Sequence, residues 1–247
     1  MFKNKRIYLT TGPSVFSSDI KCMVEKALNG IPIYVNNDNN EDLEYLAEQA
    51  DGLILAGGSD IFRGTLGQPI LHQEGLSKFD ILRDKRELKL LNYFKQQGKP
   101  ILAICRGFQL VCAEAGFSLS PDLWGNICHS LGEIKINLEN GEFAHYCECL
   151  PQYKDSYFDT DIGVNSYHHQ GIVIGKIINQ KSNLSRNGIN IVAVSDLSTN
   201  QEQNVKIAEI IESEKFKIVG SQFHIEADWM YGNQASLAVL ERFKEML

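Results

Sequence analysis

Residues 98–109 read GKPILAICRGFQ, and this stretch decides the fold class. Gly98 and Pro100 end a preceding helix, because glycine adopts the left-handed C-terminal conformation and proline cannot continue the helix. The apolar run Ile101–Ile104 predicts a short, fully buried strand, and a helix is expected to begin at Arg106. A buried strand that leads directly into a helix is typical of a parallel sheet covered by helices.

The same alternation runs through the first half of the chain. Strands are expected at residues 6–10, 31–35 and 53–56, and helices at residues 18–29, 41–50, 79–97 and 106–115. In the first helix, Ser18 or Asp19 is the expected N-cap, and Gly30 is expected just beyond the C-cap. Residues 61–77 have no such periodicity and predict a loop.

The second half of the chain has a different pattern of apolar and polar residues. Strand candidates lie at residues 134–138, 189–194, 206–211 and 217–223. Several of them alternate between apolar and polar residues, which favours antiparallel pairing. A closing amphipathic helix is expected at residues 233–246, and polar loops at 181–187 and 197–204. No repeat or linker divides the chain, so residues 1–247 are expected to form a single α/β domain.

Composition narrows the range of partners and compartments. The 247 residues carry 24 Lys+Arg against 31 Asp+Glu, a formal net charge of −7 with no basic run, so neither a nucleic acid nor a membrane is an expected partner. No apolar run approaches the ~18 residues of a membrane span, and the N-terminus has no apolar stretch of signal-peptide length. Six cysteines without framework spacing predict reduced thiols. The expected location is cytoplasmic.

Cys105 lies at the predicted junction between strand and helix. A sharp nucleophile elbow requires small residues two positions before and after the nucleophile, and Ala103 and Gly107 occupy those places. The helix N-terminus favours a thiolate at this position, and the neighbouring Arg106 is expected to add to that effect. The alternative is a buried structural cysteine, since free cysteines are often buried.

A cysteine nucleophile needs a base and a group that orients the base. His224 follows the predicted strand 217–223, and Glu226 lies two positions further on. Carboxyl ends of parallel strands share one edge of a sheet, so His224 and Cys105 can meet there. Residues 57–60 (GGSD) follow another strand, and glycine N–H groups can face an oxyanion. A structural histidine and a plain glycine turn are the respective alternatives.

Five motifs in order carry a resemblance to a known family. They are residues 51–60 (DGLILAGGSD), Arg83-Asp84 with Glu87, residues 104–109 (ICRGFQ), 165–170 (NSYHHQ) and 222–226 (QFHIE). Over about residues 45–230 the chain resembles the class I glutamine amidotransferase-like superfamily, in its γ-glutamyl hydrolase branch of cysteine peptidases. The resemblance implies a flavodoxin-like, mostly parallel central sheet flanked by helices, with some antiparallel strands in the C-terminal half.

The resemblance also implies roles. Cys105 would attack the γ-carbonyl, His224 would take the thiol proton and later protonate the leaving amine, and Glu226 would orient the imidazole. Backbone N–H groups of Gly58 and Arg106 would form the oxyanion hole. The residues implied to bind the glutamyl substrate are Gly57, Gln109, Tyr167, His168 and Gln170. The implied partner is a small-molecule γ-glutamyl substrate, with no cofactor and no metal, and a homodimer is left open.

Three functions are compatible with these residues. The first is a hydrolase that cleaves a small γ-glutamylated amine to glutamate and the amine through a thioester on Cys105. The second is a glutaminase subunit that passes ammonia to a separate synthase, which predicts stimulation by a partner. The third is a non-catalytic binding module on the same fold, which the intact Cys105, His224 and Glu226 disfavour.

The chain departs from the family pattern at two motifs. Ile225 stands where the family usually has Pro between the His and the Glu, which removes a rigid turn but keeps both chemical groups. Residues 61–64 (IFRG) replace an aliphatic residue and Pro, which suggests altered substrate contacts. The polar stretch 197–204 is longer than the usual turn and is expected to act as a rim or as a loop that binds a partner.

Two side-chain clusters have alternative explanations. Cys128, His129, His145, Cys147 and Cys149 could bind zinc by residue type, but their spacing matches no common Cys-x₂₋₄-Cys pair, so no metal is expected. Arg83, Asp84 and Glu87 lie on one helical face. There an i, i+4 ion pair gives small stabilisation, and a role near the substrate is the alternative.

Overall fold

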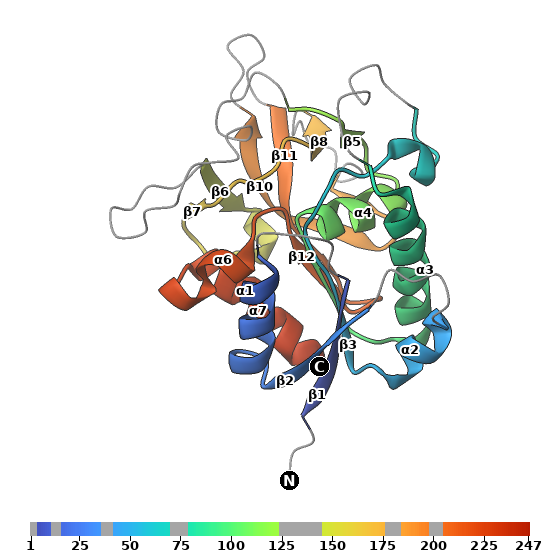
Figure 1. Cartoon of the computed structure of the whole chain (residues 1–247). Helices are drawn as coiled ribbons and strands as arrows, with labels where there is room; N and C mark the ends of the chain where they lie inside the picture. Colours follow the sequence, from blue (N-terminus) through green and yellow to red (C-terminus); the bar gives the residue numbers. More distant parts are fainter. Residues whose placement is uncertain are drawn as a thin grey trace.

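The computed structural model describes residues 4–10, 16–35, 42–69, 79–123, 145–175, 184–197 and 205–247. Within these residues a mixed sheet runs through the molecule, with helices packed on both of its faces (Figure 1). Each face has its own apolar core. One core contains residues of α2, α3 and α4, and the other contains residues of α1 and α7.

The described elements alternate in the first half as predicted. The helices are α1 (Ser17–Lys26), α2 (Leu43–Gln49), α3 (Ile81–Gln97), α4 (Arg106–Glu114), α6 (Ile225–Asp228) and α7 (Gln234–Met246). The strands are β1 (Lys5–Thr10), β2 (Gly30–Tyr34), β3 (Gly52–Leu55), β4 (Ile101–Ile104), β5 (Leu119–Ser120), β6 (His145–Cys149), β7 (Ile162–Val164), β8 (Gly171–Gly175), β9 (Ser185–Arg186), β10 (Ile189–Leu197), β11 (Val205–Ser213) and β12 (Ile218–Ser221). Short 3₁₀ turns occupy Arg63–Leu66, Pro151–Tyr153 and Trp229–Tyr231.

The order of the strands in the sheet is β2-β1-β3-β4-β12-β11-β10-β6-β7. All pairs from β2 to β12 are parallel, and those from β12 to β7 are antiparallel. The predicted fold class, with a parallel first part and antiparallel strands later, is therefore confirmed. β12 is the strand at which the direction changes, since it pairs parallel with β4 and antiparallel with β11.

Local signals placed several helix ends correctly. Asp80 caps α3 by accepting a hydrogen bond from the Arg83 N–H, and Gly98 ends that helix with φ 62°. The predicted caps of the first helix were wrong. α1 begins after Phe16, which makes no side-chain capping bond, and Gly30 is the first residue of β2. A Cβ on Gly30 would lie 3.1 Å from Ile7, so this glycine allows a close approach between neighbouring strands.

Some strands were not predicted. β6, β7 and β8 are short and lack a long apolar run, and β9 falls within the loop expected at 181–187. The strand predicted at 134–138 and most of the stretch 197–204 lie outside the described residues. Among the helices that the structure describes, none combines the length and apolar character that crossing a membrane requires.

The parallel part of the sheet brings the predicted chemistry together. β3, β4 and β12 are adjacent and parallel, so their carboxyl ends lie at one edge. Gly57 follows β3, Cys105 follows β4 and His224 follows β12. This edge is where ligands bind in open α/β sheets.

Candidate active site

Cys105 occupies a sharp turn between β4 and α4. Its backbone has φ 50° and ψ −103°, a conformation that residues with a side chain rarely adopt. The turn is held from both sides, because the Cys105 N–H donates to Ser221 O at 2.8 Å and the Gln109 N–H donates to Cys105 O at 3.0 Å. Strained backbone that is fixed in this way is typical of functional sites.

The small residues predicted around the elbow are required by its packing. A Cβ on Gly107 would overlap the carbonyl oxygen of Leu55 in β3. On the other side of β4, a Cβ on Gly220 would lie 2.7 Å from the carbonyl oxygen of Ala103. The start of α4 therefore packs directly on the neighbouring strand.

The His224 side chain contacts both of its predicted partners. Its Nδ1 lies 2.8 Å from Glu226 Oε1, and the imidazole also hydrogen-bonds the Cys105 side chain. Since Nδ1 is engaged by Glu226, we infer that Nε2 faces the sulfur. His224 and Glu226 are 4% and 1% exposed. Burial lowers the pKa of His224, but Glu226 and Cys105 outweigh it and raise that pKa well above its usual value.

Two aromatic rings surround the imidazole. The centroid of Phe16 lies 4.6 Å from that of His224, and the Tyr167 ring lies edge-on at 5.7 Å. Phe16 precedes α1, far from His224 in the chain, and no pattern in the sequence distinguishes it from a core residue. Both rings that enclose the imidazole therefore belong to residues that lie far from it in the sequence.

The glycines after β3 lie directly against the catalytic candidates. A Cβ on Gly57 would lie 2.7 Å from His224 Cε1, and one on Gly58 would overlap the Arg83 guanidinium. Arg83 Nη2 donates to the carbonyl oxygens of Thr10, Ala56 and Gly57 at 2.9, 3.1 and 3.0 Å. The loop predicted to carry the oxyanion hole is thus fixed by a buried arginine.

Arg83 belongs to a buried ion cluster beneath the elbow. Its Nε donates to Glu87 at 2.8 Å, and Arg106 pairs with both Glu87 and Asp84. The expectation that the Arg106 charge acts on the thiol needs correction, because its side chain is buried against these two carboxylates. Arg83 and Glu87 are likewise more than an i, i+4 surface pair, since both side chains are nearly inaccessible. The cluster supports the Gly57–Gly58 loop.

The predicted substrate-binding glutamines are buried and bonded to protein groups. Gln109 Nε2 donates to Gln170 O at 2.8 Å and to Gln222 Oε1 at 3.1 Å. Gln170 Oε1 accepts from the Ile61 N–H at 3.1 Å. His168 Nδ1 lies 2.9 Å from Gln170 O. A substrate contact by any of these side chains stays a prediction.

His169 attaches the same segment to the loop after Gly58. Its Nε2 lies 2.9 Å from Asp60 Oδ1, and this hydrogen bond raises the pKa of His169 even though burial opposes the shift. Together with Gln170, this side chain joins residues 165–170 to the residues that follow β3. His169 lies within the stretch 167–170 that was predicted to help bind the glutamyl group, but it was not itself named as a site residue.

The second cluster of histidine and cysteine residues forms a separate buried group. His145 Nε2 lies 2.9 Å from Glu209 Oε1, and Ser195 Oγ donates to the same oxygen at 2.6 Å. Burial raises the pKa of Cys149 to about 11 and that of Cys147 well above its usual value. Across the described ranges no three His, Cys, Asp or Glu side chains are grouped to hold a metal ion; Cys128 and His129 lie outside those ranges.

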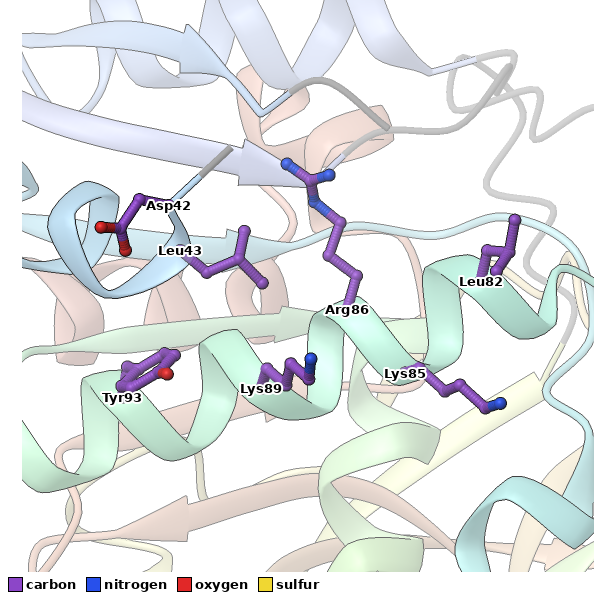
Figure 2. Close-up of a pocket in the computed structure, with 7 residues that line it drawn as sticks. All are labelled: Asp42, Leu43, Leu82, Lys85, Arg86, Lys89 and Tyr93. Atoms are coloured by element: carbon purple, nitrogen blue, oxygen red, sulfur yellow. The ribbon is translucent and has the colours of Figure 1, made fainter. Parts of the chain in front are cut away.

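A surface pocket of about 370 Å³ lies between α2 and α3, away from these residues. Its lining residues are Asp42, Leu43, Leu82, Lys85, Arg86, Lys89 and Tyr93 (Figure 2). The figure shows Arg86 and Lys85 extending to opposite sides of α3, so their charges do not converge on one point. None of the predicted site residues lines it, and the candidate active site remains the edge that carries Cys105.

Solved structures of other proteins share this fold. Two solved structures are similar over nearly all of the chain. A putative GMP synthase subunit from Thermoplasma acidophilum matches with a TM-score of 0.62 at 16% identity, covering 100% of this chain and 95% of that one. A glutamine amidotransferase from Thermotoga maritima matches with a TM-score of 0.59 at 14% identity, covering 99% and 97%.

The family follows from the sequence comparison. The profile of the family described as Peptidase C26 matches residues 3–226, so the chain belongs to that family. Protein NtpR of Enterococcus hirae is 32% identical over 58% of this chain and 60% of its own length. The putative glutamine amidotransferase-like protein YvdE of Lactococcus lactis is 25% identical over 78% and 72%. The chain thus spans about three fifths of NtpR.

Proposed function

We propose that this protein is a cysteine hydrolase that cleaves the γ-glutamyl amide bond of a small γ-glutamylated amine to glutamate and the free amine. The observation that carries the proposal is the hydrogen-bonded series Cys105, His224 and Glu226 at the carboxyl edge of the parallel strands. Membership of the Peptidase C26 family supports a hydrolase of amide bonds. The γ-glutamyl specificity is the further step of the proposal.

The proposed reaction has two halves. The Cys105 sulfur attacks the γ-carbonyl while His224 holds the thiol proton, and that proton passes to the leaving amine as the C–N bond breaks. Water then attacks the γ-glutamyl thioester with His224 as the base, which releases glutamate and restores the thiol. The N–H groups of Gly58 and Arg106 are proposed to stabilise the oxyanion in both halves.

A glutaminase that supplies ammonia to a synthase is the second candidate. The relative YvdE is named a putative glutamine amidotransferase-like protein, which favours keeping this alternative. It predicts that glutamate is released from glutamine rather than from substituted amides, and that a partner protein stimulates this activity.

The experiment that separates the candidates measures glutamate release from a panel of γ-glutamyl amides and from free glutamine. Turnover of a substituted amide well above that of glutamine, lost in Cys105→Ala, supports the hydrolase. Release from glutamine alone supports the ammonia-supplying candidate. No release from any compound contradicts the proposal.

Glu226→Gln is expected to lower kcat by about 10²–10⁴-fold and leave measurable turnover. The amide keeps the shape of the side chain but removes the negative charge that holds the His224 imidazolium. Steady-state kinetics on the best substrate of the panel measure the effect. Glu241→Gln, which changes an exposed carboxylate on α7, is the matched control. Unchanged turnover in Glu226→Gln would remove Glu226 from the triad.

Iodoacetamide is expected to label Cys105 faster than the other cysteines at neutral pH. Its sulfur hydrogen-bonds His224, whose raised pKa favours the imidazolium beside a thiolate. In contrast, burial raises the pKa values of Cys112, Cys147 and Cys149. Cys22 is partly exposed and serves as the internal reference. Mass spectrometry of peptides over a time course gives the individual rates. Equal rates at Cys105 and Cys22 would contradict the proposed thiolate–imidazolium pair.

A further inference from the structure

The backbone of His224 is held by one buried side chain. Asn165 Oδ1 accepts the His224 N–H at 2.8 Å, and Asn165 Nδ2 donates to His224 O at 2.9 Å. Asn165 is fully buried. Because a single amide binds both the N–H and the C=O of this residue, it fixes the position from which the imidazole projects.

The buried carboxylate of Asp228 orients the Asn165 side chain. Its Nδ2 also donates to Asp228 Oδ2 at 3.1 Å, and the hydroxyl of Ser236 donates to the other oxygen of Asp228. Asp228 is fully buried at the C-terminal end of α6. The carboxylate therefore accepts from two donors and leaves the Asn165 amide only one orientation that satisfies all its contacts.

The rest of the local structure holds the His224 backbone at one group, because the Ala227 N–H donates to His224 O at 3.2 Å, whereas the His224 N–H donates to Asn165. His224 is the N-cap of α6 and makes no side-chain capping bond, and Ile225 follows where a proline would restrict the chain. Glu226 acts on the ring through Nδ1, which sets the rotation of the imidazole. The ring and the backbone are thus fixed by different residues.

We propose that Asn165 is a positioning residue that holds His224 against Cys105, with Asp228 orienting the Asn165 amide. The positioning role of Asn165 rests on the proposed function in one respect, which is that His224 is the catalytic base. The hydrogen bonds of the Asn165 side chain go to the His224 backbone and to Asp228, not to the Cys105 sulfur. Loss of Asn165 changes how well the imidazole reaches Cys105.

The test measures alkylation of Cys105 by iodoacetamide between pH 5 and 8.5, as the ratio of variant to wild-type rate. In Asn165→Ala this ratio is expected to fall roughly tenfold at pH 6.5, since a thiol that has lost its hydrogen-bonded histidine has no base beside it to take its proton. The ratio is expected to recover toward one as the pH approaches 8.5. Thermal unfolding checks that the variant is folded.

N165D gives an internal control for folding. Its carboxyl would face Asp228 and the His224 carbonyl, so the two carboxyls would share a proton at low pH and repel at high pH. The ionisable groups around this pair are His224, Glu226 and Tyr167. The ratio for N165D is therefore expected near one at pH 5 and at least tenfold lower at pH 8, reversibly in the same sample.

N233D is the matched control. Asn233 lies in the same region, caps α7 by accepting from the Ser236 N–H and donates to Gly163 O, but it does not contact His224. Its alkylation ratio is expected to stay near one at every pH. An equal loss in N233D would show that the region as a whole, rather than the Asn165 contact, controls Cys105, and would overturn the proposal.

Two further outcomes separate this inference from the proposed function. If Asn165→Ala and N165D are folded and their alkylation ratios stay at one across the whole pH range, the positioning role is overturned. That conclusion does not depend on which substrate the protein cleaves. The expected ratios in a protein that releases no glutamate from any γ-glutamyl compound would uphold it and contradict the proposed function. Where a substrate is found, N165D is expected to lower kcat more than tenfold at pH 8 with little change in KM.

Discussion

Replacing Cys105 with alanine is expected to abolish glutamate release, with kcat/KM lowered by at least about 10⁴-fold. The substitution removes the only atom that can carry the proposed thioester and leaves the surrounding hydrogen bonds of the elbow intact, because these involve the backbone. The measurement is steady-state kinetics on the best γ-glutamyl amide, with circular dichroism to verify the fold. Residual turnover within tenfold of wild type would rule out covalent catalysis by Cys105.

Cys105→Gly provides a second variant that tests the elbow itself. Glycine adopts φ 50° and ψ −103° without the clash that a Cβ produces. We therefore expect the free energy of unfolding of Cys105→Gly to be about 1 kcal/mol higher than that of Cys105→Ala. Both variants are expected to be inactive. Denaturant titration of the two variants gives the difference. Equal or lower stability of Cys105→Gly would show that this backbone stores no strain.

Arg106→Ala is expected to lower the free energy of unfolding by about 3–5 kcal/mol. Arg106 is 1% exposed and pairs with Glu87 and Asp84, which are equally buried. Removing the guanidinium leaves two carboxylates in the interior with one arginine, Arg83, to compensate for them. Urea unfolding followed by fluorescence measures the loss.

Lys21→Ala is the control for Arg106→Ala. Lys21 pairs with Glu25 on α1, and both side chains are about half exposed. Exposed pairs of this kind contribute little, so the change is expected to stay within about 0.5 kcal/mol. A loss below about 1 kcal/mol in Arg106→Ala would mean that the cluster is not a structural support for the loop.

Much of the architecture could be predicted from short-range signals. Asp80 and Gly98 mark the ends of α3, and the apolar run before Cys105 identifies β4. Ala103 and Gly107 predicted the elbow because close packing of strand and helix depends on side-chain size at particular positions. These signals are local, so the sequence alone carries them.

Other features depend on contacts between distant parts of the chain. The order of the strands and the packing of Phe16 on His224 arise from tertiary structure. The direction of the Arg106 side chain was mispredicted because its adjacency to Cys105 in sequence suggested proximity of its charge. Asn165 belonged to a recognisable motif, yet only its contacts distinguish a backbone clamp from a substrate ligand.

The pairing of β4 with β12 brings Cys105 and His224 together, although these residues lie far apart in the sequence. Ile104 and Ser221 are partners in a parallel ladder, and Cys105 and His224 follow within one and three residues of that pair. Strand spacing of about 4.8 Å therefore determines the reach between sulfur and imidazole. Parts of the intervening segment that contact neither residue can change in length and composition while the reacting atoms keep their places, provided that Asn165 still binds the His224 backbone. Substrate contacts in those parts of the segment can therefore change without rebuilding the catalytic machinery.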